Sequence, residues 1–194
     1  QWFVLKKSAQ EVRSERRLPH LQVSQWEEVV SGETMEVLQN LILPDYVQRA
    51  NWFVSKDKTI YSTSIPTYTA LPIDGKDAQL LLIEVAFESG LPEYYQLPLV
   101  FVDEEEGRKL QETHAAAVLA QLTINGEPGF LCDGIYITSF QQVLIQFMAA
   151  RKRFMARGEV LFQAKEELKE YVTNTSQIKG RVHRTTELHT SLLY

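Results

Sequence analysis

The chain has 194 residues, of which 44% are hydrophobic, so it is long enough to bury the core of one sizeable domain. Its 25 acidic residues outnumber its 20 basic ones, and the formal net charge of -5 excludes a surface that attracts nucleic acid or anionic lipid as a whole. A single cysteine, Cys132, excludes an internal disulfide, and no apolar run approaches the roughly 20 residues of a membrane-spanning helix. We therefore expect a protein of a reducing compartment, the cytoplasm.

The first predicted element is a strand in residues 1–7, which contain a short apolar run. Residues 8–30 are charged and then weakly amphipathic, which predicts a linker followed by a short helix. Ser31 is placed to cap the next helix. The apolar face of that helix has residues at helical spacing, namely Met35, Leu38, Leu41 and Ile42. Pro44 is expected to break or bend it.

Three strands are predicted next, in residues 59–68, 79–87 and 94–102. The second strand is apolar on both faces except at Glu84, which indicates a central position in a sheet. Because the turn at residues 88–90 is short, the second and third strands should pair antiparallel.

A helix is expected to start at Asp103, because acidic residues favour a helix N-terminus. Its predicted buried stripe consists of Leu110, His114, Ala117, Val118 and Leu122. Residues 129–132 predict a short strand, and Ser139 should cap a longer helix. The apolar side of that helix comprises Phe140, Val143, Leu144, Phe147, Met148, Phe154 and Met155. A helix in residues 163–172 and a strand-like pattern from Gln177 complete an order that predicts an α+β fold with an antiparallel sheet.

Few residues could carry chemistry. The histidines are His20, His114, His183 and His189. None stands at zinc-ligand spacing to another histidine or to the cysteine, and His114 is expected to be partly buried on its helix. Cys132 is expected to be a buried, inert thiol. The sequence has no nucleophile elbow, phosphate-binding loop, dinucleotide fingerprint or kinase motif.

The only basic cluster consists of Arg151, Lys152, Arg153 and Arg157. It falls at the end of the helix predicted after Ser139, where cations complement the helix dipole. The alternative is a surface for a polyanion or a partner, because Phe154 lies within the cluster. The sequence leaves the role of this cluster open.

The segment 41–58, which reads LILPDYVQRANWFVSKDK, resembles the start of the maltokinase N-terminal cap domain. In that family the run is similar to Leu-Pro-x-Phe/Tyr-Leu-x-x-x-Arg-Trp-Phe-x-Gly-Lys. The structural signature carried over is Arg49, Trp52, Phe53 and Lys56. The segment departs from the family where Asn51 replaces Arg and where Ser55 and Asp57 replace Gly. Trp52 and Phe53 are expected to anchor the hinge between the first helix and the sheet. The alkyl parts of the Arg49 and Lys56 side chains are expected to cover the edge of this aromatic pair.

Three further segments carry the resemblance. Residues 81–87 and 94–99 are similar to a strand pair of the family, and residues 130–136 are similar to its Leu-x-Asp-Ala-Leu-Tyr run. The resemblance places the cap domain in residues 31–176. It implies a curved antiparallel sheet flanked by helices.

Residues 177–194 resemble the first strand or hairpin of a kinase-like N-lobe. Thr190 and Ser191 match the loop that would contact nucleotide phosphates, although His189 replaces Asn and Leu188 replaces Ser. The resemblance therefore implies ATP and Mg²⁺ as cofactors of a parent kinase, with no cofactor held by this chain alone.

Residues 1–7 resemble the closing strand of the β-domain of trehalose synthases. The combined resemblance implies a non-catalytic cap cut from a trehalose synthase–maltokinase fusion, with a synthase barrel upstream and kinase lobes downstream as partners. The parent would interconvert maltose and trehalose and phosphorylate maltose to maltose 1-phosphate. The alternative is an independent protein-binding module of cystatin-like shape, although the chain lacks a Gln-x-Val-x-Gly loop.

Overall fold

The computed structural model describes residues 17–73, 76–155, 159–164, 168, 181–184 and 190–193. The elements of the first half are β1 (His20–Val23), η1 (Trp26–Val30), α1 (Gly32–Val37), the π-helical turn η2 (Leu38–Ile42), α2 (Leu43–Arg49), β2 (Ile60–Ile73), β3 (Lys76–Phe87) and β4 (Glu93–Asp103). Those of the second half are α3 (Glu104–His114), η3 (Ala115–Ala117), β5 (Val118–Ile124), β6 (Glu127–Asp133), η4 (Gly134–Tyr136), α4 (Thr138–Ala149), β7 (Arg153–Met155), β8 (Glu159–Leu161), β9 (Arg181–Arg184) and β10 (Thr190–Leu193).

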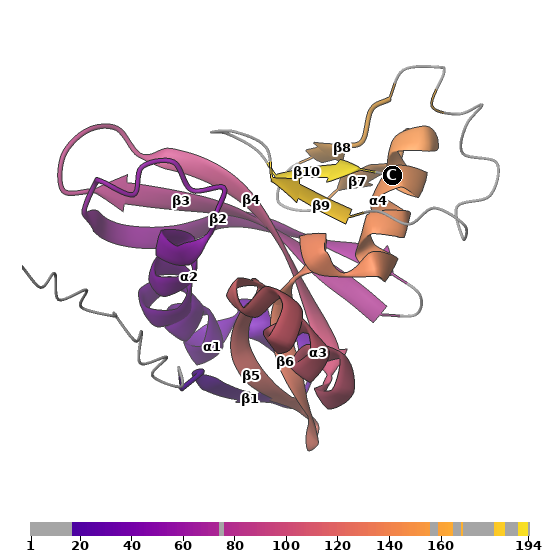
Figure 1. The fold of residues 1–194 in the computed structure, drawn as a ribbon, viewed down its shortest axis with the longest axis horizontal. Helices are drawn as coiled ribbons and strands as arrows, with labels where there is room; N and C mark the ends of the chain where they lie inside the picture. The colour runs from indigo at the N-terminus through magenta and orange to yellow at the C-terminus, as the bar shows by residue number, and fades with distance from the viewer. Residues whose placement is uncertain are drawn as a thin grey trace, which may run out of the picture.

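A strongly curled six-stranded sheet organises the fold, with the strand order β1-β5-β6-β4-β3-β2 (Figure 1). The strands β2, β3 and β4 form a long antiparallel meander, and the short turn at residues 88–90 predicted the pairing of β3 with β4. The α+β class with a curved sheet and flanking helices is thus confirmed. The sheet is mixed, because β1 pairs with β5 in parallel at one edge.

Two strands of this sheet were not predicted. The strand β1 lies within residues 8–30, which were expected to hold only a linker and a short helix. The strand β5 occupies positions assigned to the helix that starts after Asp103. That helix ends at His114, which is exposed, so the predicted stripe through Val118 and Leu122 is wrong. The alanines of η3 favour helix locally, but Val118 and Leu122 pack in the sheet against β6 and are fully buried there.

Three smaller expectations also need correction. Pro44 does not break the helix, because the backbone stays helical from the π-helical turn η2 into α2, in whose first turn Pro44 lies. The helix α4 starts at Thr138 and has Ile137 as its N-cap, so Ser139 is not the cap. Phe154 and Met155 belong to β7, beyond the end of α4. The expected strand in residues 1–7 lies outside the described residues, as do nearly all positions of the expected helix 163–172.

Helices cover both faces of the sheet. The residues of η2 and α2 pack on one face against Leu81, Ile83 and Leu97. The residues of α3 and α4 pack on the other face against Val100 and Phe130. Figure 1 shows α1 and α2 on one side of the long strands and α4 on the other. No helix in the described part of the chain is long and apolar enough to cross a membrane.

The π-helical turn η2 is bonded to the outermost strand, β2. Gln39 accepts hydrogen bonds from Thr63 Oγ1 at its backbone oxygen (2.5 Å) and from Ile65 N at its side-chain oxygen (2.8 Å). These bonds lie beside an irregularity in the pairing of β2 with β3, between Ser64 and Thr67. A helix turn therefore provides the polar partners that the irregular strand lacks.

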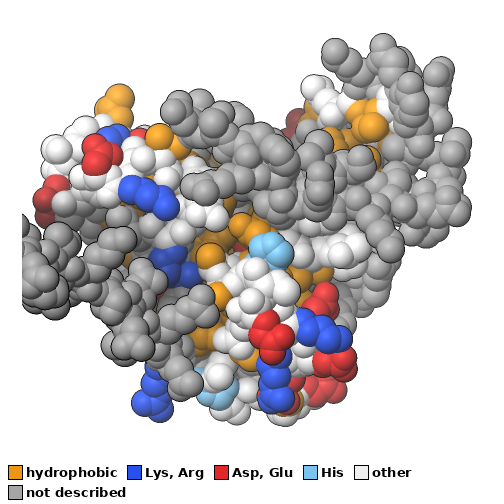
Figure 2. All heavy atoms as spheres, viewed as in Figure 1, with side chains coloured by type: hydrophobic (Ala, Val, Ile, Leu, Met, Phe, Trp, Pro, Cys, Tyr) orange, Lys and Arg blue, Asp and Glu red, His pale blue; other side chains and the backbone are white. Residues whose placement is uncertain are grey.

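The helix α3 contributes a charged surface. Its N-cap Asp103 accepts a hydrogen bond from the backbone of Glu106, as the acidic start predicted. Arg108 and Lys109 then form ion pairs one turn along the helix, with Glu104 at 3.1 Å and with Glu105 at 2.6 Å. Figure 2 shows acidic and basic side chains side by side over this part of the molecule. Such exposed pairs each stabilise a helix by only about 0.3–0.5 kcal/mol.

Candidate functional site

The signature residues Arg49, Trp52, Phe53 and Lys56 lie where α2 gives way to the sheet. The helix ends because Ala50 adopts an extended conformation (φ −59°, ψ 133°), while its N–H still bonds to the Tyr46 carbonyl at 2.9 Å. The loop that follows turns across the end of the sheet and leads into β2. Arg49 is thus the last residue of α2, and the other three lie on the short connection that follows.

The two aromatic side chains join this connection to the core. Phe53 is buried, stacks on Phe87 (ring centroids 6.3 Å apart) and meets the edge of Tyr95 (5.8 Å). Trp52 lies against Tyr95 (5.0 Å) and Tyr46 (6.0 Å). These packed rings hold the end of α2 against β3 and β4.

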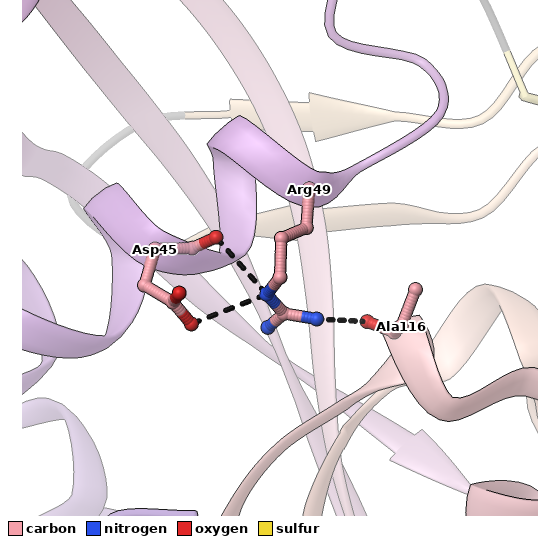
Figure 3. Close-up of polar contacts among 3 residues, drawn as sticks. All are labelled: Asp45, Arg49 and Ala116. Atoms are coloured by element: carbon pink, nitrogen blue, oxygen red, sulfur yellow. Dashed lines mark hydrogen bonds and ion pairs between the residues drawn. The ribbon is translucent and has the colours of Figure 1, made fainter. Parts of the chain in front are cut away.

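Arg49 connects α2 to a distant part of the chain. Its Nε donates to the backbone oxygen of Asp45 (3.1 Å) and to the carboxylate of Asp45 (3.2 Å), while one terminal nitrogen donates to the Ala116 carbonyl (3.5 Å; Figure 3). The guanidinium also lies 5.8 Å from the ring centre of Tyr46. Lys56, in contrast, is exposed, and its backbone carbonyl accepts a bond from Gln48 (3.3 Å).

A buried carboxylate lies beneath the aromatic cluster. Asp133 is only 2% exposed, accepts a hydrogen bond from the Tyr46 hydroxyl and accepts another from the backbone N–H of Ile135 at 2.9 Å. Burial raises the pKa of Asp133 to about 6, although both hydrogen bonds oppose the rise. Burial and the neighbouring carboxylate also raise the pKa of Tyr46 well above its usual value.

A second polar cluster is centred on Glu93 at the start of β4. Its carboxylate accepts hydrogen bonds from Ser55 Oγ (2.7 Å), Lys58 Nζ (2.9 Å) and the Tyr95 hydroxyl. Desolvation raises the pKa of Glu93, but these hydrogen bonds outweigh it and lower the pKa below the usual value. Ser55, which replaces Gly in the signature, therefore has a defined partner in the fold.

A groove of about 870 Å³ runs beside both polar clusters. Its walls are mainly apolar and include Trp52, Leu82, Phe140 and Leu144. Asp133 lies in its lining, whereas the described residues contain no group of three or more side chains arranged to hold a metal ion. The site thus offers an apolar binding surface with a few fixed polar groups.

A comparison with known families finds a match that covers this region. Residues 46–136 match the family model of the maltokinase N-terminal cap domain. This part of the chain is similar to a maltokinase N-terminal cap domain. A search of the curated proteins finds no match to the chain.

The two ends of the matched segment lie close together in the fold. The match begins at Tyr46 and ends at Tyr136, so the Tyr46–Asp133 hydrogen bond joins its first residue to its last strand. Sequence reasoning missed this pair, because Asp133 was considered only as part of a turn and of the family-like run 130–136. The signal was present in the family runs, since Tyr46 occupies their Phe/Tyr position and Asp133 occupies their Asp position.

The remaining candidates lie away from this cap-domain site. Cys132 is buried in β6, as expected, and burial raises the pKa of its thiol. His114 is exposed, with its ring 5.2 Å from that of Tyr136, so the expectation of a partly buried imidazole is wrong.

The predicted phosphate contacts lie in the last described strand. Thr190 and Ser191 begin β10, which pairs antiparallel with β9. Their contact with a nucleotide stays a prediction. In the basic cluster, Arg153 forms an ion pair with Glu159 (2.6 Å) across the hairpin of β7 and β8, whereas Arg157 lies outside the described residues.

Proposed function

We propose that this chain is a non-catalytic cap that supports the kinase lobes of a larger maltokinase. The family match over residues 46–136 carries the proposal. The signature residues support a structural role. Trp52 and Phe53 pack against other aromatic rings of the domain, and Arg49 donates a hydrogen bond to the Ala116 carbonyl. In the parent protein, lobes downstream of the cap would phosphorylate maltose to maltose 1-phosphate with ATP and Mg²⁺.

The proposal extends to a fusion with trehalose synthase. Its support is the resemblance of residues 1–7 to the closing strand of a synthase β-domain. The parent would then interconvert maltose and trehalose in the cytoplasm and pass maltose to the kinase. Sequencing the coding region on either side of this chain tests the fusion. We expect a (β/α)₈ barrel before the chain and kinase motifs after it, and their absence would contradict the fusion.

Calorimetry tests the non-catalytic role directly. The chain is titrated with ATP and Mg²⁺, and separately with maltose. We expect no binding tighter than about millimolar, because the phosphate-binding and metal-binding groups would come from the downstream lobes. Micromolar binding of either ligand would overturn the proposal. Loss of such ATP binding in Thr190→Ala or Ser191→Ala would then assign a nucleotide site to this chain.

A further inference from the structure

Among the described strands, none pairs with one edge of the first half of β4. It pairs with β3 from Glu93 to Leu99, but β6 joins its other side only from Leu99 to Asp103. The strand β6 stops at Asp133 because the Asp133 carboxylate bonds to Ile135 N and turns the chain into η4. No other described strand continues along the first half of β4.

The 870 Å³ groove follows this open edge. Its lining includes Glu93, Tyr94, Tyr95 and Gln96, and then Pro98. Successive residues of a strand point to opposite faces, so consecutive residues can line one groove only if it lies along the strand edge. The groove therefore exposes backbone of β4 as well as side chains.

Proline fixes which backbone groups point into the groove. Pro98 has no N–H and lies opposite Leu80, so it suits a position whose N–H would point away from β3. Hydrogen-bonding direction alternates along an antiparallel strand. The N–H and carbonyl groups of Tyr94 and Gln96 consequently point to the same open side as the carbonyl of Pro98.

The walls of the groove suit the side chains of an added strand. Trp52 packs with the core on one face of the sheet, while Leu80, Ile135 and Leu144 pack with the core on the other face. An extended segment laid along β4 would place alternate side chains against these two apolar surfaces.

The charged residues of the groove determine which charge the two ends of a bound segment should carry. The charged residues of its lining, Glu93 and Asp133, are both acidic, and Glu84 accepts a bond from Tyr94 beside them. Lys58 is already paired with Glu93. Asp133 is buried, so the partly exposed carboxylates of Glu84 and Glu93 are the acidic groups that favour basic groups on the ligand.

We propose that the groove along β4 is a strand-addition site, which binds an extended apolar polypeptide segment with basic flanks. The segment would pair antiparallel or parallel with Tyr94–Pro98 and continue the sheet where β6 ends. This site is independent of the kinase role of the parent protein, because it needs only the backbone edge and the groove walls.

Peptide binding tests the proposal. The probe is a fluorescent peptide of alternating valine and threonine with lysines at both ends, compared with a glutamate-flanked version and with one in which the central valine is proline. We expect the lysine-flanked peptide to bind at least about tenfold more tightly than either control. Amide hydrogen exchange should slow at Tyr94 and Gln96 when it binds.

Two variants with the same substitution locate the site. Leu82→Lys introduces a cation into the groove wall at a half-buried position and should weaken binding at least about tenfold. Leu91→Lys changes a side chain that is 83% exposed in the β3–β4 turn and should leave binding unchanged. Thermal unfolding of both variants confirms that they fold. The proposal fails if none of the peptides binds, if the proline peptide binds equally well, or if the β4 amides gain no protection.

Discussion

Replacing Asp133 by asparagine is expected to stabilise the protein at neutral pH. The asparagine can still accept the bond from Ile135 N and face the Tyr46 hydroxyl, but it places no charge in the buried site. The pKa of Asp133 is about 6 in the folded protein, against an ordinary value of 3.8. The folded state therefore holds its proton over a range where the unfolded state has lost it.

The sign and size of the effect follow from this difference. Between pH 4 and 6 the folded state binds more protons, so stability from this group falls as pH rises through that window and is fully lost above it. The shift from 3.8 to about 6 corresponds to about 3 kcal/mol. Asp133→Asn should gain up to this amount at pH 7.5 and nothing below pH 4.

Urea unfolding of both proteins from pH 4 to pH 8 measures the difference at each pH. Asp77→Asn, at an exposed carboxylate, is the matched control and should change stability by less than about 0.5 kcal/mol at every pH. A difference between wild type and Asp133→Asn that stays flat over this range would refute the reasoning, as would a less stable variant at pH 7.5.

Three other variants test the packing of the cap, each by urea unfolding at neutral pH. Phe53→Ala should cost about 3–5 kcal/mol, because it empties the contact with Phe87; a loss below 1 kcal/mol would contradict core anchoring. Arg49→Lys should cost about 1 kcal/mol through the lost bond to Ala116, and an unchanged stability would show that this bond contributes nothing. Gly107→Ala should destabilise, although alanine normally favours a helix, because its Cβ would lie 2.1 Å from the Phe130 ring; a more stable variant would refute this contact.

Local patterns predicted the parts of the fold that local forces determine. The strands β3 and β4 were readable because their apolar residues alternate or run continuously on either side of a short turn. The start of α3 was readable from Asp103 and the acidic residues after it. In contrast, β5 follows three alanines, and its strand conformation depends on pairing with β6.

The polar centre of the site was harder to predict for a related reason. Tyr46 and Asp133 are separated by 87 positions in the sequence, and no local periodicity brings them together. The open edge of β4 likewise arises where β6 ends, which is a property of the sheet and of no single segment. The aromatic signature at Trp52 and Phe53 was recognisable only as a family run, and its packing partners came from the structure.

The bond between η2 and β2 has a consequence for solubility. The strand β2 spans 14 residues at the outer edge of the sheet, and long exposed edges of this kind tend to pair with other chains and aggregate. The N–H of Ile65 already donates a hydrogen bond to the Gln39 side chain, and the next residue, Pro66, has no N–H. A foreign strand would therefore meet a gap near the middle of β2, which protects the outer edge of the sheet in a way that no described strand protects the recessed edge of β4.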